Sequence, residues 1–404
     1  MEKANNMKNK AEEFVCEVCK HTFLSLWSHP NPLGKSGKEL CDVLIVCEPH
    51  IIIFSVKEIK VSDSGSLIID WKRWNRKAVE ESSKQIYGAE RWLKASTHVI
   101  KKDGTQGLAL PKKEDQIIHR VVVALGGKNK VPIIYGDFGR GFIHVFDEIS
   151  FNIILHEQDT ITDFIRYLSA KESLYQSGID TPFLAGEENL LALYIHRGMT
   201  FPSDINKIII SEDAWNTLIN KPEYKVRKEQ DKVSYLWDKL IDDIGHQIEA
   251  GTLALKNAEG NGELILRTMA REDRFGRRIL GKSFAEFIHL SAENKIRARM
   301  VTSPTEVLYV FLAVPPSVKR KYRLAELATR CFIARGLNQQ IKIVIGIATE
   351  QYQPRIEHSF DLYYLYKPDW TEKDQATMEL IQKESGFFIK MTSSEAREDE
   401  YPQD

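Results

Sequence analysis

The sequence lacks a long uninterrupted run of apolar residues, an excess of charge of either sign, and a cysteine framework. No apolar run approaches the roughly 18 residues that a membrane-spanning helix requires, and residues 1–14 lack the apolar core of a signal peptide. The five cysteines show no repeated spacing, which is typical of a protein in a reducing compartment. We therefore expect a cytoplasmic protein with no membrane partner.

The charges of the chain balance almost completely. Its 404 residues include 56 Lys and Arg and 57 Asp and Glu, which gives a net charge of −1. No overall positive field attracts such a chain to nucleic acid, so binding of a polyanion has to depend on local basic patches. Hydrophobic residues make up 43% of the chain, as is usual for a globular protein, and its length predicts two or three domains.

The most informative segment runs from Lys38 to Lys60, KELCDVLIVCEPHIIIFSVKEIK. It predicts two apolar strands, VLIV and IIIF, joined by a tight turn at Glu48-Pro49-His50. Asp42 stands immediately before the first strand, and Ser55 and Lys57 follow the second. Because Ser55 and Lys57 are two residues apart, we expect their side chains on one face of the strand.

A buried hairpin does not need an aspartate at one end and a lysine at the other. Burying such charges is costly unless they are paired or bind a metal. Phosphodiester cleavage with a divalent cation uses both groups, since a carboxylate holds the cation and an ammonium lies near the attacking water or the phosphate. The alternative is a surface ion pair that closes the hairpin and contributes little stability.

Asp42, followed by Ser55-Val56-Lys57 at the end of an apolar strand, resembles the PD-(D/E)XK nuclease superfamily. This superfamily includes restriction endonucleases, Holliday-junction resolvases and many bacterial defence nucleases. The resemblance implies a helix, a three-stranded meander, a second helix and a further strand, with Mg²⁺ or Mn²⁺ held at the meander. We therefore expect an α/β protein with an N-terminal restriction-endonuclease-like αβββαβ core and a second, C-terminal α/β domain.

The chain departs from the family pattern at Ser55, where the pattern has a metal-binding Asp or Glu. A hydroxyl is a weaker ligand for a hard cation than a carboxylate, so either another acid substitutes or the site has lost catalysis. Glu39 is the nearest substitute in sequence. Glu13 is a second one, because the first helix of this superfamily often donates an acidic ligand and a helix is predicted here at 10–27. The metal ligands that the resemblance implies are Asp42, Glu39 and Glu13.

A long helix predicted at 77–94 adds polar groups to this site. In related nucleases the corresponding helix packs across the meander and places a glutamine or lysine over the active site, which here would be Gln85 or Lys84. An exposed polar pair on the helix surface is the alternative. The implied catalytic residues are Asp42, Lys57, Ser55, Glu39 and Gln85.

Two basic runs are candidates for contact with phosphate. The run at 72–77, KRWNRK, lies close to the hairpin in sequence, whereas the run at 319–323, KRKYR, is the weaker candidate. Either run can also be the solvated face of a helix or loop. The predicted nucleic-acid contacts are Lys72, Arg73, Arg76, Lys77 and Lys84.

Further periodic segments divide the rest of the chain. A turn and a short third strand are predicted within 62–70, and further strands at 119–125, 131–135 and 141–146. A helix begins near Thr162, with Thr160 or Thr162 as its N-cap. Helices are also predicted at 264–278 and 284–299. Strands at 307–314, 341–349 and 360–366 around a helix at 322–333 predict a second α/β domain. The expected domains are a nuclease-like domain at 1–175, a helical connecting region at 176–260, an α/β domain at 261–391 and a disordered acidic tail at 392–404.

Together these patterns predict a metal-dependent nuclease that hydrolyses phosphodiester bonds of nucleic acid. DNA is the expected substrate, and defence against phage or plasmid DNA is the expected role. Whether the chain forms a homo-oligomer stays open. The competing hypothesis is a catalytically silent nuclease-fold module that binds nucleic acid or a protein partner, with Ser55 as the mark of lost activity.

Overall fold

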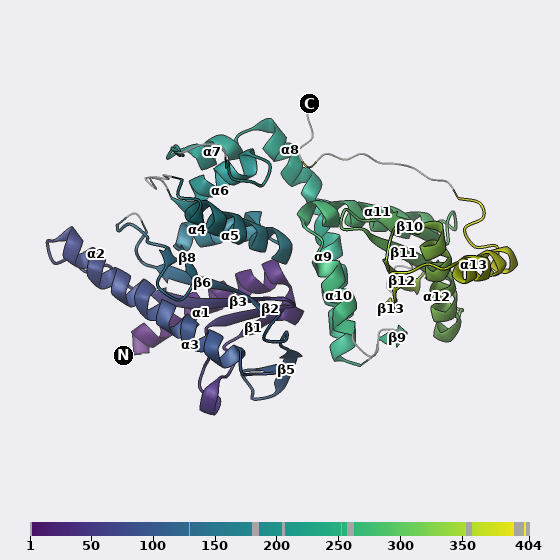
Figure 1. Ribbon diagram of the computed structural model, residues 1–404, viewed down its shortest axis with the longest axis horizontal. Coiled ribbons are helices and arrows are strands. Elements are labelled where there is room, and N and C mark those ends of the chain that lie inside the picture. The colour runs from purple at the N-terminus through teal and green to yellow at the C-terminus, as the bar shows by residue number, and fades with distance from the viewer. Residues whose placement is uncertain are drawn as a thin grey trace. The chain divides into compact units, whose positions relative to one another are not determined.

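The computed structural model describes residues 2–128, 130–179, 186–203, 207–251, 253–256, 262–352, 358–391 and 400. Internal contacts divide the chain into two compact units, Met1–Lys221 and Pro222–Asp404 (Figure 1). Residues 176–221 of the predicted connecting region therefore fall in the first unit and residues 222–260 in the second. Both units combine helices with a sheet, so the chain is a mixed α/β protein. The predicted tail at 392–404 lies outside the described residues, except for Glu400.

A six-stranded sheet forms the centre of the first unit. Strand β2 is antiparallel to β1 and β3, while β3, β6 and β8 run parallel to one another and β7 is antiparallel to β8. In spatial order the strands are β1 (Ser28–Pro30), β2 (Val43–Cys47), β3 (His50–Glu58), β6 (Ile117–Leu125), β8 (Phe142–Phe146) and β7 (Gly136–Asp137). The predicted hairpin is thus β2 and β3, and the predicted strands at 119–125 and 141–146 are β6 and β8.

Helices cover both faces of this sheet, which is why its central strands are continuously apolar. On one face the ring of Phe54 in β3 packs against Phe23, Phe151 and Phe164. These rings come from α1 (Glu2–Phe23), α4 (Glu148–Glu157) and α5 (Ile161–Gln176), and Thr160 caps α5 as predicted. On the other face, side chains of the sheet form one core cluster with Trp74, Val79, Ile86 and Leu93.

That second face is covered by a single long helix, drawn as one continuous ribbon in Figure 1. It consists of α2 (Leu67–Asn75), a π-helical turn η3 (Arg76–Glu80) and α3 (Glu81–Leu93). The indole Nε1 of Trp74 donates to the carbonyl of Ile59 at 2.9 Å, and that of Trp71 donates to the carbonyl of Pro132 at 3.0 Å. The helix is therefore tied to the chain that follows β3 and to the loop that follows β6.

Two strands predicted in this region are wrong. No strand forms at 62–70, because Leu67 already begins α2 and the Asp70 carboxylate accepts hydrogen bonds from the Ser62 hydroxyl and the Ser64 amide. No strand forms at 131–135 either. Pro132 has no amide hydrogen to donate to a neighbouring strand, and its carbonyl is bonded to Trp71 instead.

The remaining elements of the first unit are short. They are η1 (Ser25–Trp27), η2 (Lys35–Gly37), the two-stranded sheet of β4 (His98–Ile100) and β5 (Gln106–Ala109), α6 (Glu187–His196) and α7 (Ala214–Ile219). All five cysteines of the chain are buried and free.

A five-stranded sheet forms the second unit, in the order β10 (Ala298–Thr302), β11 (Val307–Val314), β12 (Ile343–Glu350), β13 (Asp361–Tyr366) and β9 (Ala254–Lys256). The helix α12 (Arg320–Leu337) joins β11 to the parallel strand β12. Strands β11, β12 and β13 and helix α12 confirm the predicted strand–helix alternation. The other elements are α8 (Pro222–Asp231), η4 (Lys232–Ser234), α9 (Tyr235–Glu249), α10 (Gly262–Ala270), α11 (Arg274–Ala292) and α13 (Glu372–Ser385).

The helices predicted at 264–278 and 284–299 have different limits in the structure. A break follows Ala270, and α11 starts at Arg274 because the Asp273 side chain accepts a hydrogen bond from the amide of Gly276 and so caps it. The segment from Ala298 is strand β10 rather than helix. Among the described residues, no helix has the length and apolar character that crossing a membrane demands.

Candidate functional site

The carboxylate of Asp42 is buried at the end of the hairpin. Its residue is only 1% exposed, and the backbone continues the β2–β3 pairing, since the Asp42 amide donates to the carbonyl of Phe54 at 3.2 Å. Its Oδ2 accepts a hydrogen bond from the amide of Val56 at 2.7 Å. Burial raises the pKa of Asp42 to about 6, although the Val56 hydrogen bond and the positive charge of Lys57 act in the opposite direction. A carboxylate in this position ionises near neutral pH.

Ser55 and Lys57 follow on β3, and the structure brings Gln85 to them. Ser55 is fully buried, and its hydroxyl donates to Oε1 of Gln85 on α3 at 3.0 Å. Lys57 is half-buried and close enough to Asp42 for its ammonium to lower the pKa of that carboxyl. The position where the family pattern has an acid is therefore filled by a serine that is hydrogen-bonded to an amide.

Two glutamates add negative charge to this site. The charges of Glu12 and Glu39 both raise the pKa of Asp42. Glu39 is exposed beyond the hairpin. Glu12 is half-buried on α1, whereas Glu13, the residue chosen from the sequence, is exposed.

Sequence reasoning missed Glu12, although the helical phase carries the signal. Glu12 lies one turn before Cys16, which is buried and whose pKa is raised mainly by burial and partly by the charge of Asp42. The face of α1 that carries the buried Val15, Cys16 and Cys19 is the one that packs on the sheet.

The cations predicted to contact nucleic acid all lie on the long helix. Lys72 and Arg73 belong to α2, Arg76 and Lys77 to η3, and Lys84 to α3. All are exposed, and in the described part of the chain none of their side chains forms a hydrogen bond or ion pair. Lys84 directly precedes Gln85, so the row of cations along the helix ends next to the residue that bonds to Ser55.

The groups around Asp42 include few ligands for the divalent cation that the resemblance implies. Among the residues described, no three His, Cys, Asp or Glu side chains are arranged to hold a metal ion. Mg²⁺, however, keeps several waters and is usually held through only one or two carboxylates and the phosphates of its substrate. The Asp42 carboxylate, the Ser55 hydroxyl and the Gln85 amide oxygen are hard donors that fit such a cation, with Glu12 and Glu39 as nearby acids.

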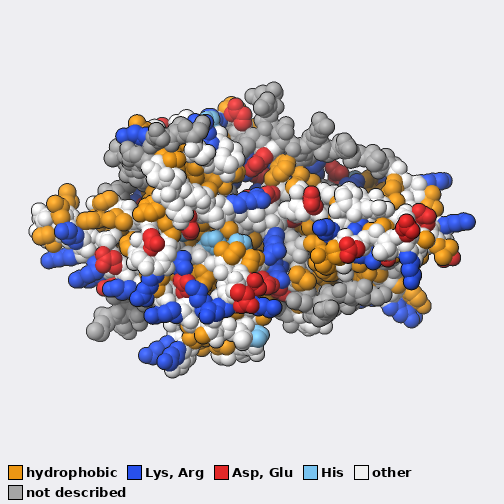
Figure 2. All heavy atoms as spheres, viewed as in Figure 1, with side chains coloured by type: hydrophobic (Ala, Val, Ile, Leu, Met, Phe, Trp, Pro, Cys, Tyr) orange, Lys and Arg blue, Asp and Glu red, His pale blue; other side chains and the backbone are white. Residues whose placement is uncertain are grey.

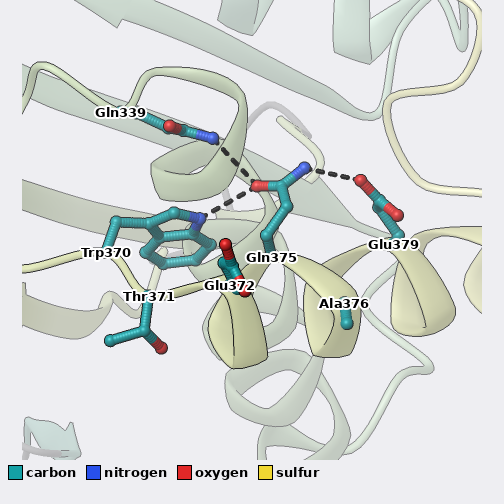
Figure 3. Close-up of a pocket in the computed structure, with 7 residues that line it drawn as sticks. All are labelled: Gln339, Trp370, Thr371, Glu372, Gln375, Ala376 and Glu379. Atoms are coloured by element: carbon teal, nitrogen blue, oxygen red, sulfur yellow. Dashed lines mark hydrogen bonds between the residues drawn. The ribbon is translucent and has the colours of Figure 1, made fainter.

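The second unit has a shallow pocket of different character, with a volume of about 330 Å³ (Figure 3). The Gln375 side chain spans it. Its Oε1 accepts from Gln339 at 3.0 Å and from the indole of Trp370 at 2.9 Å, and its Nε2 donates to Glu379 at 2.7 Å. Both ends of the Gln375 amide are thus bonded within the pocket wall. This pocket is separate from the site at Asp42, which belongs to the other unit.

Comparison with family models, with curated proteins and with solved structures gives no match for this chain. Its function is therefore inferred from the groups around Asp42.

Proposed function

We propose that the first unit is a metal-dependent nuclease that hydrolyses phosphodiester bonds of nucleic acid, with DNA as the substrate. The observation that carries the proposal is the buried Asp42 carboxylate, which lies beside the Lys57 ammonium at one end of the hairpin. No arginine or lysine among the described residues bonds this acid directly, so burying it is costly, and buried acids of this kind are concentrated at functional sites. Defence against phage or plasmid DNA is the role that the resemblance adds to this proposal.

The order of elements supports the same assignment. Helix α1, the antiparallel strands β1, β2 and β3, the long helix from α2 to α3, and β6 parallel to β3 follow in this order along the chain, with the short strands β4 and β5 between α3 and β6. Apart from these two short strands, the order is consistent with the αβββαβ core that the resemblance to PD-(D/E)XK nucleases implies. Asp42, directly before β2, and Ser55 and Lys57 on β3 supply polar groups of the kind that the resemblance implies at this hairpin.

Each residue of the site has a role in this proposal. A bound Mg²⁺ or Mn²⁺ would supply an activated water and stabilise the charge that develops on the phosphate. Asp42 would hold the cation, with Glu12 or Glu39 as the second acid. Lys57 would orient the water or neutralise charge on the phosphate oxygens. The hydrogen bond from the Ser55 hydroxyl to Oε1 of Gln85 would hold the Gln85 amide in one orientation over the site.

A second candidate function follows from Ser55. Its hydroxyl replaces the family's acid and is committed to Gln85, which is an arrangement that a silent module could keep for packing alone. In that case the unit would bind nucleic acid or a protein partner without cleaving it.

Cleavage assays with matched variants separate the two candidates. Plasmid, linear duplex and single-stranded substrates are incubated with Mg²⁺ or Mn²⁺, with and without chelator. Asp42→Asn and Lys57→Ala should each lower the rate about 100-fold or more. The exposed controls Asp63→Asn and Lys102→Ala should cleave like the wild type. Full cleavage in chelator would refute the metal mechanism, and no cleavage of any substrate would favour the silent module.

Titration of Mn²⁺ by calorimetry identifies the second acid without relying on activity. Glu12→Gln and Glu39→Gln each remove a charge that acts on Asp42, so at least one of them should weaken Mn²⁺ binding. Glu13→Gln is the matched control, because it removes the same charge from the exposed neighbouring position. If only Glu13→Gln weakens binding, the assignment to Glu12 is wrong.

A further inference from the structure

The first turn of α2 exposes three large apolar side chains in a row. Leu67 is 80% exposed, Ile68 65% and Ile69 46%. The chain before them is not loose, because Ser62 and Ser64 both hydrogen-bond to the Asp70 carboxylate and so fix the approach to the helix. The exposed apolar tip, Leu67 to Ile69, is thus held in place by its own turn of helix. A surface of this kind usually contacts a partner.

Unpaired cations follow the apolar tip directly. Lys72, Arg73, Arg76 and Lys77 come within the next turns of the same helix, and within the described chain none has a hydrogen-bonded or ion-paired partner. Figure 2 shows Lys and Arg side chains gathered along this part of the first unit. We call residues 67–80, which combine the apolar tip with these cations, the arm.

A loop beside the arm carries two more cations. Lys128 and Lys130 are exposed in the segment between β6 and Pro132, whose carbonyl is bonded to Trp71. The same loop packs closely on the arm, since a Cβ atom added at Gly127 would lie 2.5 Å from the Trp74 ring. Sequence reasoning missed these two lysines because they are distant from the basic run along the chain.

The arm starts from the end of the sheet that carries Asp42 and Lys57. Strands β3 and β6 are parallel and both end there, and β2 is antiparallel to β3, so Asp42 before β2 lies at the same end. Trp74 bonds to Ile59, which directly follows β3. From Lys84 to Leu67 the helix covers 17 positions, or about 25 Å at 1.5 Å per residue. A duplex lying along it would span about seven base pairs.

We propose that the arm binds duplex nucleic acid at an open fork, with phosphates on its cations and the bases of the fork packed against Leu67, Ile68 and Ile69. Leucine and isoleucine side chains are used in this way by proteins that contact unstacked base steps. The four cations of the arm outnumber its two acids, Asp70 and Glu80, and this excess argues for a polyanion, because a second copy of the chain would bring two positively charged surfaces together. The inference rests on the proposed function, whose substrate class it narrows to duplexes with an unpaired end or branch.

Binding measured in chelator tests the arm independently of cleavage. Fluorescence anisotropy compares a forked duplex with a blunt duplex of the same sequence over a range of salt concentrations. Leu67→Ser combined with Ile68→Ser should weaken binding to the fork about tenfold or more, leave the blunt duplex unchanged and keep the salt dependence. Arg73→Ala combined with Arg76→Ala should weaken both duplexes and reduce the slope of log K against log salt by about 2.

Matched controls come from the second unit. Leu380→Ser changes a leucine that is 57% exposed on α13, and Lys373→Ala with Lys383→Ala removes two exposed cations of the same helix. Neither control should alter binding. Sedimentation and a thermal melt are recorded for every variant, so that a folding defect is recognised.

The outcomes separate this inference from the proposed function. The inference is overturned if the Leu67→Ser/Ile68→Ser variant binds the fork as tightly as the wild type. It is also overturned if this variant loses self-association, because the apolar tip would then contact a second copy of the chain. Fork-selective binding without cleavage of any substrate leaves the inference intact and refutes the nuclease. Cleavage with no difference between fork and blunt duplex refutes the inference alone.

Discussion

Each unit carries a buried aspartate and a run of basic residues, and the two units combine them in opposite ways. In the second unit, Arg320 and Arg323 of the run at 319–323 both bond to the carboxylate of Asp361, which is fully buried, and Arg323 also pairs with Glu350. In the first unit, the cations at 72–77 have no such partner among the described residues, and Asp42 is bonded by a backbone amide instead.

The difference shows that a basic run in a sequence does not by itself indicate whether its cations are paired with buried acids or exposed. The first turns of α12 lie against the start of β13 and the end of β12, where two acids meet them. The arm exposes its cations on the side opposite the buried Trp74 and Val79. In the second unit these charges pair with one another and stabilise the connection between β11 and β12. In the first unit the described residues give Asp42 no ion-pair partner within bonding distance and leave the cations of the arm exposed. We expect this contrast to appear in stability measurements.

The largest effect is expected for Arg323→Ala. Removing this buried guanidinium leaves Asp361 with only Arg320 and Glu350 without its close partner, so the free energy of unfolding of the second unit should fall by about 3 to 5 kcal/mol. Urea unfolding of the full chain measures it. Lys321→Ala, an exposed neighbour in the same run, should change stability by less than about 0.5 kcal/mol. Equal effects of the two variants would contradict the assigned pairing.

The next effect concerns Asp42 and pH. Its pKa is about 6 when folded, against 3.8 ordinarily, so the folded state holds the proton more tightly. Wild-type stability therefore contains a term that is lost as pH rises from about 4 to about 6 and stays lost above that. The side chain at this position in the Asp42→Asn variant cannot ionise. Without divalent cation, the free energy of unfolding of this variant should therefore exceed that of the wild type by an amount that grows to about 2 to 3 kcal/mol as the pH rises through this window. Unfolding at several pH values tests this, with Asp63→Asn as control. Parallel curves for Asp42→Asn and wild type would show that Asp42 is not perturbed.

A smaller effect is expected for Ser55→Ala. The variant removes one buried hydrogen bond to Gln85, which is worth about 0.5 to 1.5 kcal/mol. Ser82→Ala is the matched control, since Ser82 is equally buried but its hydroxyl has no partner in the described part of the chain. Thermal melts of both variants should show a loss only for Ser55→Ala. A similar loss for both would mean that packing, rather than the hydrogen bond, holds this position.

The smallest effect has the opposite sign. Lys72 and Arg76 are like charges one helical turn apart, and such pairs destabilise a helix by about 0.2 to 0.5 kcal/mol. No acid lies three or four positions from Lys72, so Lys72→Gln should stabilise the first unit slightly at low salt and have no effect at high salt. Differential melts at two salt concentrations measure this change. A destabilised Lys72→Gln variant would show that this cation has a partner after all.

The strands that the sequence predicts correctly are those with long apolar runs, since such a run leaves only one assignment. Strands β2, β3, β11 and β12 are continuous runs of β-branched and aliphatic residues, and their polar boundaries place Asp42, Ser55 and Lys57. The approach of Gln85 to Ser55 could also be expected, because the resemblance names the helix that crosses the meander.

Predictions fail where a tertiary contact decides. The apolar segments at 62–70 and 131–135 resemble strands, yet hydrogen bonds to Asp70 and from Trp71 place them in a helix start and a loop. The choice of Glu13 over Glu12 is a different case, because the spacing of Glu12 one helical turn before Cys16 already carries the signal. The pairing of Arg323 with Asp361 joins residues 38 positions apart, and no local pattern signals it.

The π-helical turn η3 determines the direction in which the apolar tip of the arm faces. A π-helical turn holds one residue more than the α-helix would, and each α-helical residue turns the chain by about 100°. The extra residue at 76–80 therefore sets the rotation of the apolar tip independently of the rotation that brings Gln85 to Ser55. Deleting one residue there would keep both ends helical and swing Leu67 to Ile69 about a quarter turn around the axis. The π-helical turn thus sets the rotation of α2 relative to α3 about the helix axis, and with it the direction in which the apolar tip faces relative to Gln85.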